Sequence, residues 1–199
     1  AFRIYSGSGE HASAINVLVE HVVSIDRAQQ YANKLDQPEL WSRLAKAQLD
    51  GLRIKDAIDS YVRAEDPSNF DEVIELAERA GREEELIRYL QMARRKAREP
   101  RIDTEYAYCL AKANRLSDME EFLGMTNVAD VLSVGDKCFG DGLYEAARML
   151  YSSVSNYARL ASTLVYLSDY QGAVEAARKA GNTAVWKHVH AACINKGEL

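Results

Sequence analysis

The sequence predicts an all-α fold: a right-handed α-α superhelix, or solenoid, of short antiparallel helix pairs with about 27–33 residues per pair. Two observations carry this prediction. Helix-forming residues fill segment after segment with apolar residues at helical spacing, and similar segments recur at a nearly constant interval. A single pair of such helices leaves an apolar face uncovered, so stacked neighbours are expected to share one continuous core.

The segment LWSRLAKAQL, residues 40–49, shows the helical pattern clearly. Its apolar face consists of Leu40, Trp41, Leu44, Ala45, Ala47 and Gln48. These positions follow the i, i+3, i+4, i+7 spacing of one side of an α-helix, with the charged residues elsewhere. We expect this face to be buried against neighbouring helices.

Six segments begin with an apolar or small anchor residue that is followed about four positions later by an aromatic or aliphatic one. The anchors are Ala28, Ala57, Leu86, Met119, Ala146 and Ala173, at intervals of 29, 29, 33, 27 and 27 residues. A second set of helical segments lies between them, so each unit is expected to be a pair of helices. The 33-residue interval is four longer than 29, about one helical turn, and the extra turn is expected within residues 84–100.

The prolines follow the same interval and mark the entry to the second helical set. They are Pro38, Pro67 and Pro100, separated by 29 and 33 residues. Proline fits the first turn of a helix, because a backbone N–H at that position would have no hydrogen-bond partner within the helix. We expect Asp66 to be a helix N-cap. In later units, three asparagines are expected as caps or turn residues: Asn127, Asn156 and Asn182.

Composition restricts the class of protein. With 47% hydrophobic and 28% charged residues, the 199-residue chain is expected to fold as a single continuous α-solenoid over residues 1–199, a fragment of a longer chain. Apolar runs are too short to span a bilayer, and no secretory leader is recognisable. A net charge of −5 argues against a nucleic-acid partner. Three widely spaced cysteines favour a reducing, cytosolic setting.

The basic cluster ARRKAR, residues 93–98, has two interpretations. It closes a helix that opens with three glutamates, so its cations lie where the helix dipole favours positive charge. This favours a solvated helix end. The alternative is a docking patch for an acidic partner, carried by Arg94, Arg95, Lys96 and Arg98.

No other motif predicts catalysis or a bound cofactor. The glycine-rich GDKCFGDG, residues 135–142, lacks the ending of a phosphate loop and is expected to be a helix end and turn. The histidines have no catalytic or metal-binding pattern around them: His11, His21, His188 and His190, even though His190 and Cys193 are three residues apart. Cys109 and Cys193 are expected to be buried hydrophobes. We therefore predict no enzyme activity and no catalytic, cofactor-binding or metal-binding residues.

Aromatic residues recur near the start of the second helical set. They are Trp41, Phe70, Tyr106, Tyr157 and Trp186. We expect them to pack in the core at the junctions between repeats, rather than to stack on a ligand.

Several long stretches resemble the leg of the clathrin heavy chain. They are WSRLAKAQLDGLRIKDAIDSYVRAEDPS, YLQMARRKARE, AKANRLSDMEEFL and ARLASTLVYLSDYQGAVEAARKAGNTAVWK. The resemblance covers nearly the whole chain and points to the passage from the distal to the proximal leg. It implies a structural scaffold that forms lattice edges of coated pits and coated vesicles in endocytosis and intracellular transport.

The resemblance also implies partners and a location. Other clathrin heavy chains and the clathrin light chain are the expected partners, without nucleic acid or direct membrane insertion, and adaptors bind parts of the family's chain that are absent here. The expected location is the cytoplasmic face of coated pits and vesicles. The alternative is a peptide-binding adaptor of tetratricopeptide type, although the 34-residue pattern of those repeats is not kept.

Overall fold

The computed structural model of the chain describes residues 1–21 and 24–196, and every regular element in these ranges is helical. In chain order they are α1 (Phe2–Gly7), α2 (His11–Asn16), the π-helix η1 (Val17–His21), α3 (Ile25–Leu35), α4 (Pro38–Asp50), α5 (Ile54–Ala64), α6 (Phe70–Arg79), α7 (Glu83–Lys96), α8 (Pro100–Lys112), α9 (Leu116–Gly124), α10 (Val131–Gly140), α11 (Tyr144–Ser153), α12 (Tyr157–Tyr166), α13 (Tyr170–Ala180) and α14 (Thr183–Lys196). Within the described ranges, no helix has the length and apolar character needed to cross a membrane. The prediction of an all-α fold of short helices is confirmed.

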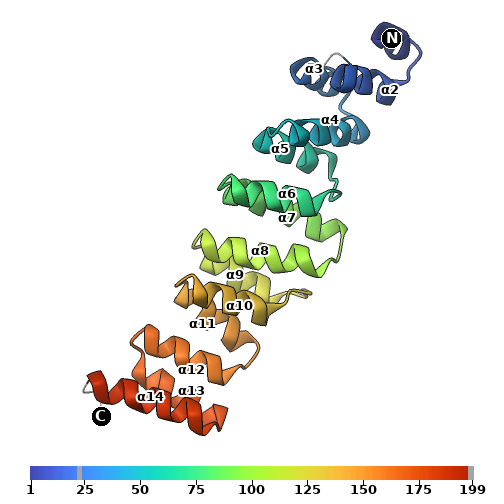
Figure 1. The fold of residues 1–199 in the computed structure, drawn as a ribbon. Helices are drawn as coiled ribbons and strands as arrows, with labels where there is room; N and C mark the ends of the chain where they lie inside the picture. Colours follow the sequence, from blue (N-terminus) through green and yellow to red (C-terminus); the bar gives the residue numbers. More distant parts are fainter. Residues whose placement is uncertain (22–23, 197–199) are drawn as a thin grey trace. The chain divides into compact units, whose positions relative to one another are not determined.

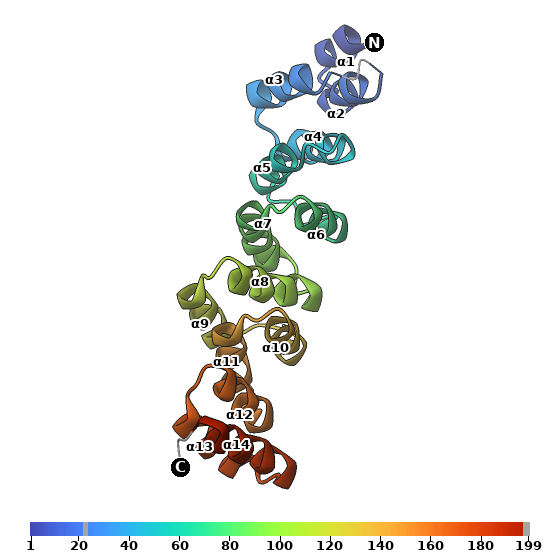
Figure 2. The same cartoon turned by 60° about the vertical axis from the view of Figure 1, so that its left-hand side comes forward.

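The chain forms two compact units, Ala1–Ile102 and Asp103–Leu199, and the division falls within α8. Helices that follow one another pack together, as α4 with α5, α6 with α7, α10 with α11 and α12 with α13, and some helices two apart also touch, as α5 with α7 and α12 with α14. Figures 1 and 2 show the result in the first unit, where α2, α4 and α6 form one row and α3, α5 and α7 a second. In the second unit, α12 packs on both α13 and α14. These are the contacts of an α-solenoid.

The core of the first unit is built from the apolar stripes that the sequence predicted. On α4, Leu40 and Leu44 are buried and join Ile15 and Leu18 from the preceding helices in one cluster. Each large aliphatic side chain that is fully buried stabilises the fold by about 1.5–3 kcal/mol. Gln48 is buried on the same stripe, where its Oε1 accepts a 2.6 Å hydrogen bond from Ser60 Oγ of α5.

A pair of buried tyrosines joins α5 to α7. The rings of Tyr61 and Tyr89 meet edge to face with their centroids 5.9 Å apart. The Tyr89 hydroxyl donates to the carbonyl oxygens of Pro67 and Ser68, and Asn69 Nδ2 donates to the Tyr61 hydroxyl at 3.0 Å. The tyrosines therefore fix the loop between α5 and α6.

In the second unit, small side chains dominate the core between α12, α13 and α14. The buried cluster consists of Ala161, Leu164, Ala173, Ala176, Ala177, Val189 and Cys193. Alanine lets helix backbones approach closely and is also the best helix former. This explains why the anchors of the repeat include so many alanines.

Two of the three prolines occupy the predicted place. Pro38 and Pro100 are the first residues of α4 and α8. Pro67 instead lies in the turn before α6, three residues ahead of the helix.

The prediction that Asp66 is an N-cap is wrong. Asn69 is the N-cap of α6, and its backbone has a left-handed conformation with φ of 60°. The Asp66 carboxylate instead bonds to the turn that precedes α6: its Oδ1 accepts a hydrogen bond from the backbone N–H of Ser68 at 2.9 Å. Asp66 thus forms an Asx turn, because a short acidic side chain can bond to the backbone two residues on.

The three predicted asparagines act as caps or turn residues. Asn156 is the N-cap of α12, and its side chain accepts from the backbone N–H of Arg159. Asn182 precedes α14, and its Oδ1 accepts from the N–H of Ala184. Asn127 lies in the loop before α10, and its Oδ1 accepts from the N–H of Ala129.

The predicted extra turn is also present. Helix α7 has 14 residues, whereas α5 has 11 and α9 has 9. The glycine-rich stretch 135–142 is the second half of α10 followed by a turn, in agreement with the prediction.

One turn geometry recurs that the sequence did not reveal. In eight turns between the described helices, a residue with a positive φ is followed by an N–H that donates to the carbonyl five positions before it, at 2.8–3.1 Å. Three of these residues are Gly9, Glu65 and Ser155. The other five recur at intervals of 26–33 residues: Leu52 (57°), Gly81 (62°), Asn114 (54°), Gly142 (76°) and Ser168 (61°). These bonds belong to the Schellman motif, which satisfies the last carbonyls of a helix. The fold repeats this turn at about the same interval as the helices.

Candidate interaction surfaces

Among the described residues, no three His, Cys, Asp or Glu side chains come together in a way that could hold a metal ion. The exposed histidines include His21, His188 and His190, while Cys193 is buried, so His190 and Cys193 do not form a common site. His11 is half-buried, and its Nδ1 is hydrogen-bonded to the Tyr31 hydroxyl at 2.8 Å.

The cysteines are buried side chains. Cys109, Cys138 and Cys193 are each at most 2% exposed, which confirms the prediction for Cys109 and Cys193. Burial raises the pKa of the Cys138 thiol to about 12. Since the thiolate is the nucleophile, Cys138 is unreactive at neutral pH.

The predicted core role of the junction aromatics holds for two of the five. Trp41 and Tyr106 are buried, whereas Phe70 and Tyr157 are half-buried. For Trp186 the prediction is wrong, because its side chain is 45% exposed. Helix α14 contributes Val189 and Cys193 to the core, and Trp186 lies beside the turn at Gly181 instead.

The basic cluster at the end of α7 is partly engaged. The ammonium group of Lys96 pairs with the Glu65 carboxylate, and this hydrogen bond lowers the pKa of Glu65. Arg94 is half-buried, while Arg95 and Arg98 are exposed. Helix-end electrostatics and a docking patch both remain compatible with this geometry.

Ion pairs connect one repeat to the next. Those in the first unit are Arg53–Asp26 (3.0 Å), Arg63–Asp36 (2.9 Å), Arg88–Asp59 (2.8 Å), Lys96–Glu65 (2.5 Å) and Arg101–Asp71 (2.8 Å). Those in the second are Arg159–Asp136 (2.8 Å) and Lys137–Glu105 (3.9 Å). In all seven the cation belongs to the later repeat; Lys46–Glu72 has the opposite order. Each exposed pair contributes about 0–1 kcal/mol. In the sequence, the basic residue of each of these seven pairs follows its acidic partner by 23–32 residues, and this spacing is the signal from which the pairs could have been predicted.

Arg63 makes several of these contacts at once. Its guanidinium lies 4.2 Å from the centroid of the Trp41 ring and also donates to Asn33 Oδ1 at 3.0 Å. Asp36 Oδ1 accepts from both Arg63 and the Trp41 indole N–H. This cluster joins α3, α4 and α5.

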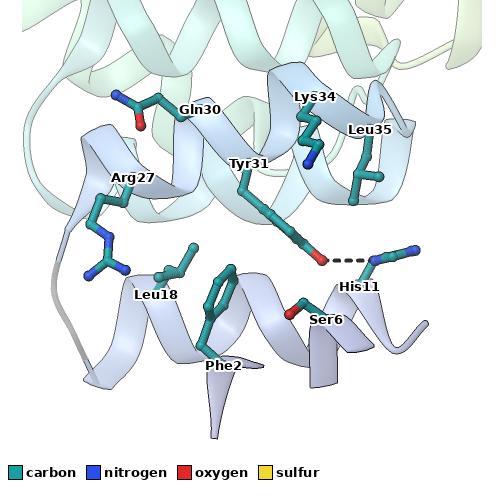
Figure 3. Close-up of a pocket in the computed structure, with 9 residues that line it drawn as sticks. All are labelled: Phe2, Ser6, His11, Leu18, Arg27, Gln30, Tyr31, Lys34 and Leu35. Carbon is teal, nitrogen blue, oxygen red and sulfur yellow. Dashed lines mark hydrogen bonds between the residues drawn. The ribbon is translucent and has the colours of Figure 1, made fainter. Parts of the chain in front are cut away.

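The first unit carries a groove of about 500 Å³ between α3 and the helices that precede it, named here the α3 groove (Figure 3). It is lined by Phe2, Ser6, His11, Leu18, Arg27, Gln30, Tyr31, Lys34 and Leu35. The Tyr31 side chain crosses the groove to His11, and the Phe2 ring meets it edge to face at 5.2 Å. Figure 3 shows Arg27 and Lys34 reaching from α3 at its two ends. Its lining contains cations but no carboxylate.

The second unit carries a groove of about 550 Å³ over α10, α11, α12 and α14. Its cation Arg159 pairs with Asp136, which also accepts a hydrogen bond from the Tyr151 hydroxyl at 2.7 Å. The Tyr166 ring is 55% exposed and stacks on Tyr144 with centroids 4.9 Å apart. This groove is aromatic, and its arginine already has an anionic partner.

Stacked helix pairs, joined by ion pairs between repeats, define a helical-repeat scaffold. A sequence model of the clathrin repeat, described as a region in clathrin and VPS, matches residues 61–199. Over all 199 residues the chain is 60% identical to the probable clathrin heavy chain of Schizosaccharomyces pombe. It is 48% identical to the clathrin heavy chain of Drosophila melanogaster and to clathrin heavy chain 2 of Homo sapiens.

The chain belongs to the clathrin heavy-chain family. It spans 12% of the length of each of these three relatives, and all of its own length is matched. The resemblance to the clathrin leg is therefore confirmed, and the tetratricopeptide alternative is not favoured.

Proposed function

We propose that the chain is a non-enzymatic leg segment of the clathrin coat, which forms lattice edges of coated pits and vesicles in endocytosis and intracellular transport. The observation that carries this proposal is the identity of 60% to a probable clathrin heavy chain over every residue of the chain. The stacked helix pairs support it, because repeats that contact only their neighbours build long scaffolds rather than closed catalytic sites.

The proposed partners are other clathrin heavy chains, running alongside this segment in the lattice, and the clathrin light chain. Adaptor binding is assigned to parts of the heavy chain outside these residues. The proposed location is the cytoplasmic face of coated pits and vesicles. We also propose that residues 1–199 form one continuous right-handed solenoid, in which small changes at each repeat junction add up to leg bending.

A segment exchange tests the proposed function. The matching segment of the S. pombe heavy chain would be replaced by this chain, and the purified heavy chain would be assembled into cages and viewed by electron microscopy. We expect cages to form, because the two segments are 60% identical over all 199 residues of the chain. A tetratricopeptide array of equal length serves as the control and is expected to prevent assembly.

The proposal fails if the exchanged heavy chain is folded and trimeric but forms no cages under conditions in which the parent does. Light-chain binding is read separately by co-purification. Loss of the light chain with normal cages would remove only that partner from the proposal.

A further inference from the structure

The α3 groove carries two cations that the described part of the fold leaves without an anion. Arg27 and Lys34 are both exposed on α3, and neither forms an ion pair with any described residue. Several other exposed cations of this unit pair with an acid of the preceding repeat, as at Arg63 and Arg88. The α3 groove is therefore a break in the series of ion pairs.

The register of the repeats explains the break. Asp36 and Glu65 are the C-cap residues of α3 and α5, and they pair with Arg63 and Lys96, which follow 27 and 31 residues later. The C-cap of α1 is Ser8, and Lys34 follows it by 26 residues. A serine thus stands where the next two repeats have a carboxylate.

The groove lining combines polar and apolar side chains, so the missing anion would come with a chain that also carries apolar groups rather than as a small ion. Phe2 and Leu18 are among the apolar side chains that line it, and Figure 3 shows both on the side that faces α3. The groove volume of about 500 Å³ lies within the roughly 300–1,000 Å³ range of ligand sites. The π-helix that supplies Leu18 is an irregularity of a kind found frequently at functional sites.

We propose that the α3 groove binds an acidic peptide segment of a partner protein. Arg27 and Lys34 are seven residues apart on one helix, which places them about 10 Å apart along its axis. In a polyproline II chain, which has three residues per turn, side chains three residues apart lie on the same side and about 9 Å apart. The segment therefore carries acidic residues at i and i+3, and an apolar residue between them packs beside Phe2 on an adjacent side of the chain.

A membrane fits the groove less well, because an anionic membrane is flat whereas the two cations flank a recessed groove. The α10–α14 groove offers no equivalent site, because Arg159 is already paired with Asp136.

Fluorescence polarisation tests the proposal directly. The probe is a short fluorescein-labelled peptide with Glu at every third position and Leu or Phe between, and its control has Gln in place of each Glu. We expect the Glu peptide to bind the chain at physiological ionic strength. The double variant Arg27→Glu/Lys34→Glu should weaken binding by about tenfold or more, since a tenfold loss corresponds to 1.4 kcal/mol.

The matched control is Lys55→Glu/Lys187→Glu, which changes the net charge equally at exposed positions of α5 and α14 that do not line the groove. It should bind the probe as the parent chain does. Ser6→Trp fills the groove without changing its charge and should also abolish binding. Circular dichroism checks that each variant is folded, and Ser6→Trp keeps the test decisive if the charge-reversed variant unfolds.

Several results would overturn the proposal. These are absence of binding, equal binding of the Gln peptide, equal loss in both charge variants, and loss of binding when a longer heavy chain replaces the 199-residue chain. A groove-dependent dimer in sedimentation would assign the site to a second copy. Groove-dependent binding to phosphatidylserine vesicles without peptide binding would assign it to a membrane. The outcome is independent of cage assembly, so it does not rest on the coat role.

Discussion

Gly135 shows how closely the helices of the second unit approach one another. It is buried within α10, and a Cβ atom at this position would lie 2.7 Å from Cε1 of Tyr151. The ring is held there because the Tyr151 hydroxyl donates a hydrogen bond to Asp136 Oδ1 at 2.7 Å. Glycine is needed at 135 for a side-chain contact and not for a turn.

We expect Gly135→Ala to lower the free energy of unfolding by up to about 2 kcal/mol. Overpacking a core costs about 1–3 kcal/mol, and the better helix propensity of alanine offsets about 1 kcal/mol of that cost. Urea unfolding followed by circular dichroism measures the difference.

Gly140→Ala is the matched control, because it lies in the same helix and its Cβ would meet no atom within 4 Å. It should leave stability unchanged or raise it by up to about 1 kcal/mol. Equal effects of the two substitutions would show that the contact with Tyr151 is energetically unimportant.

At the residue scale, the sequence predicted burial better than it predicted contacts. The apolar stripe of α4 could be read from its spacing, and Leu40 and Leu44 are buried as expected. The role of Gly135 depends on Tyr151, 16 residues later, so no local pattern could reveal it. Trp186 was expected in the core because it lies near the start of its predicted helical segment, as the other four aromatics do in theirs. Which residues of α14 face the core depends on its packing against α12 and α13, where Val189 and Cys193 are buried instead.

At the scale of the elements, the recurring turn is the feature that orients each helix pair. Its left-handed position is glycine in two of the five turns, but it is leucine at 52, where φ is 57°. A left-handed conformation costs an L-residue with a Cβ atom about 1–2 kcal/mol. The Leu52 side chain is 68% exposed, so its burial offsets little of that conformational cost.

Leu52→Gly is therefore expected to raise the free energy of unfolding by up to about 1 kcal/mol, after the greater flexibility of glycine in the unfolded chain is deducted. The reverse change, Gly81→Ala, should lower it by about 1 kcal/mol. No clash contributes there, because the nearest atom to the new Cβ would be Glu83 Oε2 at 4.0 Å. Guanidinium unfolding curves of both variants provide the measurement.

A lower free energy of unfolding for Leu52→Gly would contradict this account. It would show that the contacts of the Leu52 side chain stabilise the fold by more than the removal of the backbone strain does. The pair is informative because the two turns share one hydrogen-bond pattern. The N–H groups of Arg53 and Arg82 donate to carbonyl oxygens five residues before them, at 2.8 and 2.9 Å.

The helix pairs, their interval and the longer α7 were predictable because helical spacing and proline positions are local signals. The recurring turn was not predictable, because only two of its five left-handed positions, Gly81 and Gly142, are glycines, the residue type that indicates a left-handed conformation in a sequence. The ion pairs between repeats were missed for another reason. Acid and base lie about one repeat apart, so their contact becomes visible only when the repeats are stacked.

At the scale of the whole molecule, a solenoid differs from a globular domain in how far a local change spreads. In a repeat protein each repeat contacts its neighbours, and stability is approximately a sum of repeat and interface terms. The first and second units here each have their own buried clusters, one around Leu44 and one around Leu164. Destabilising one cluster should leave the other largely protected.

Hydrogen exchange measured by mass spectrometry tests this expectation with two substitutions. Leu44→Ala removes a fully buried side chain in α4 and should cost about 2–5 kcal/mol; it is expected to speed amide exchange in α2 to α5 and leave α12 to α14 unchanged. Gly135→Ala should do the reverse, with faster exchange around α10 to α12 and the parent's protection in α4 and α5. Uniformly faster exchange along the chain in both variants would show that the units unfold as one cooperative domain, against the additive behaviour of a solenoid.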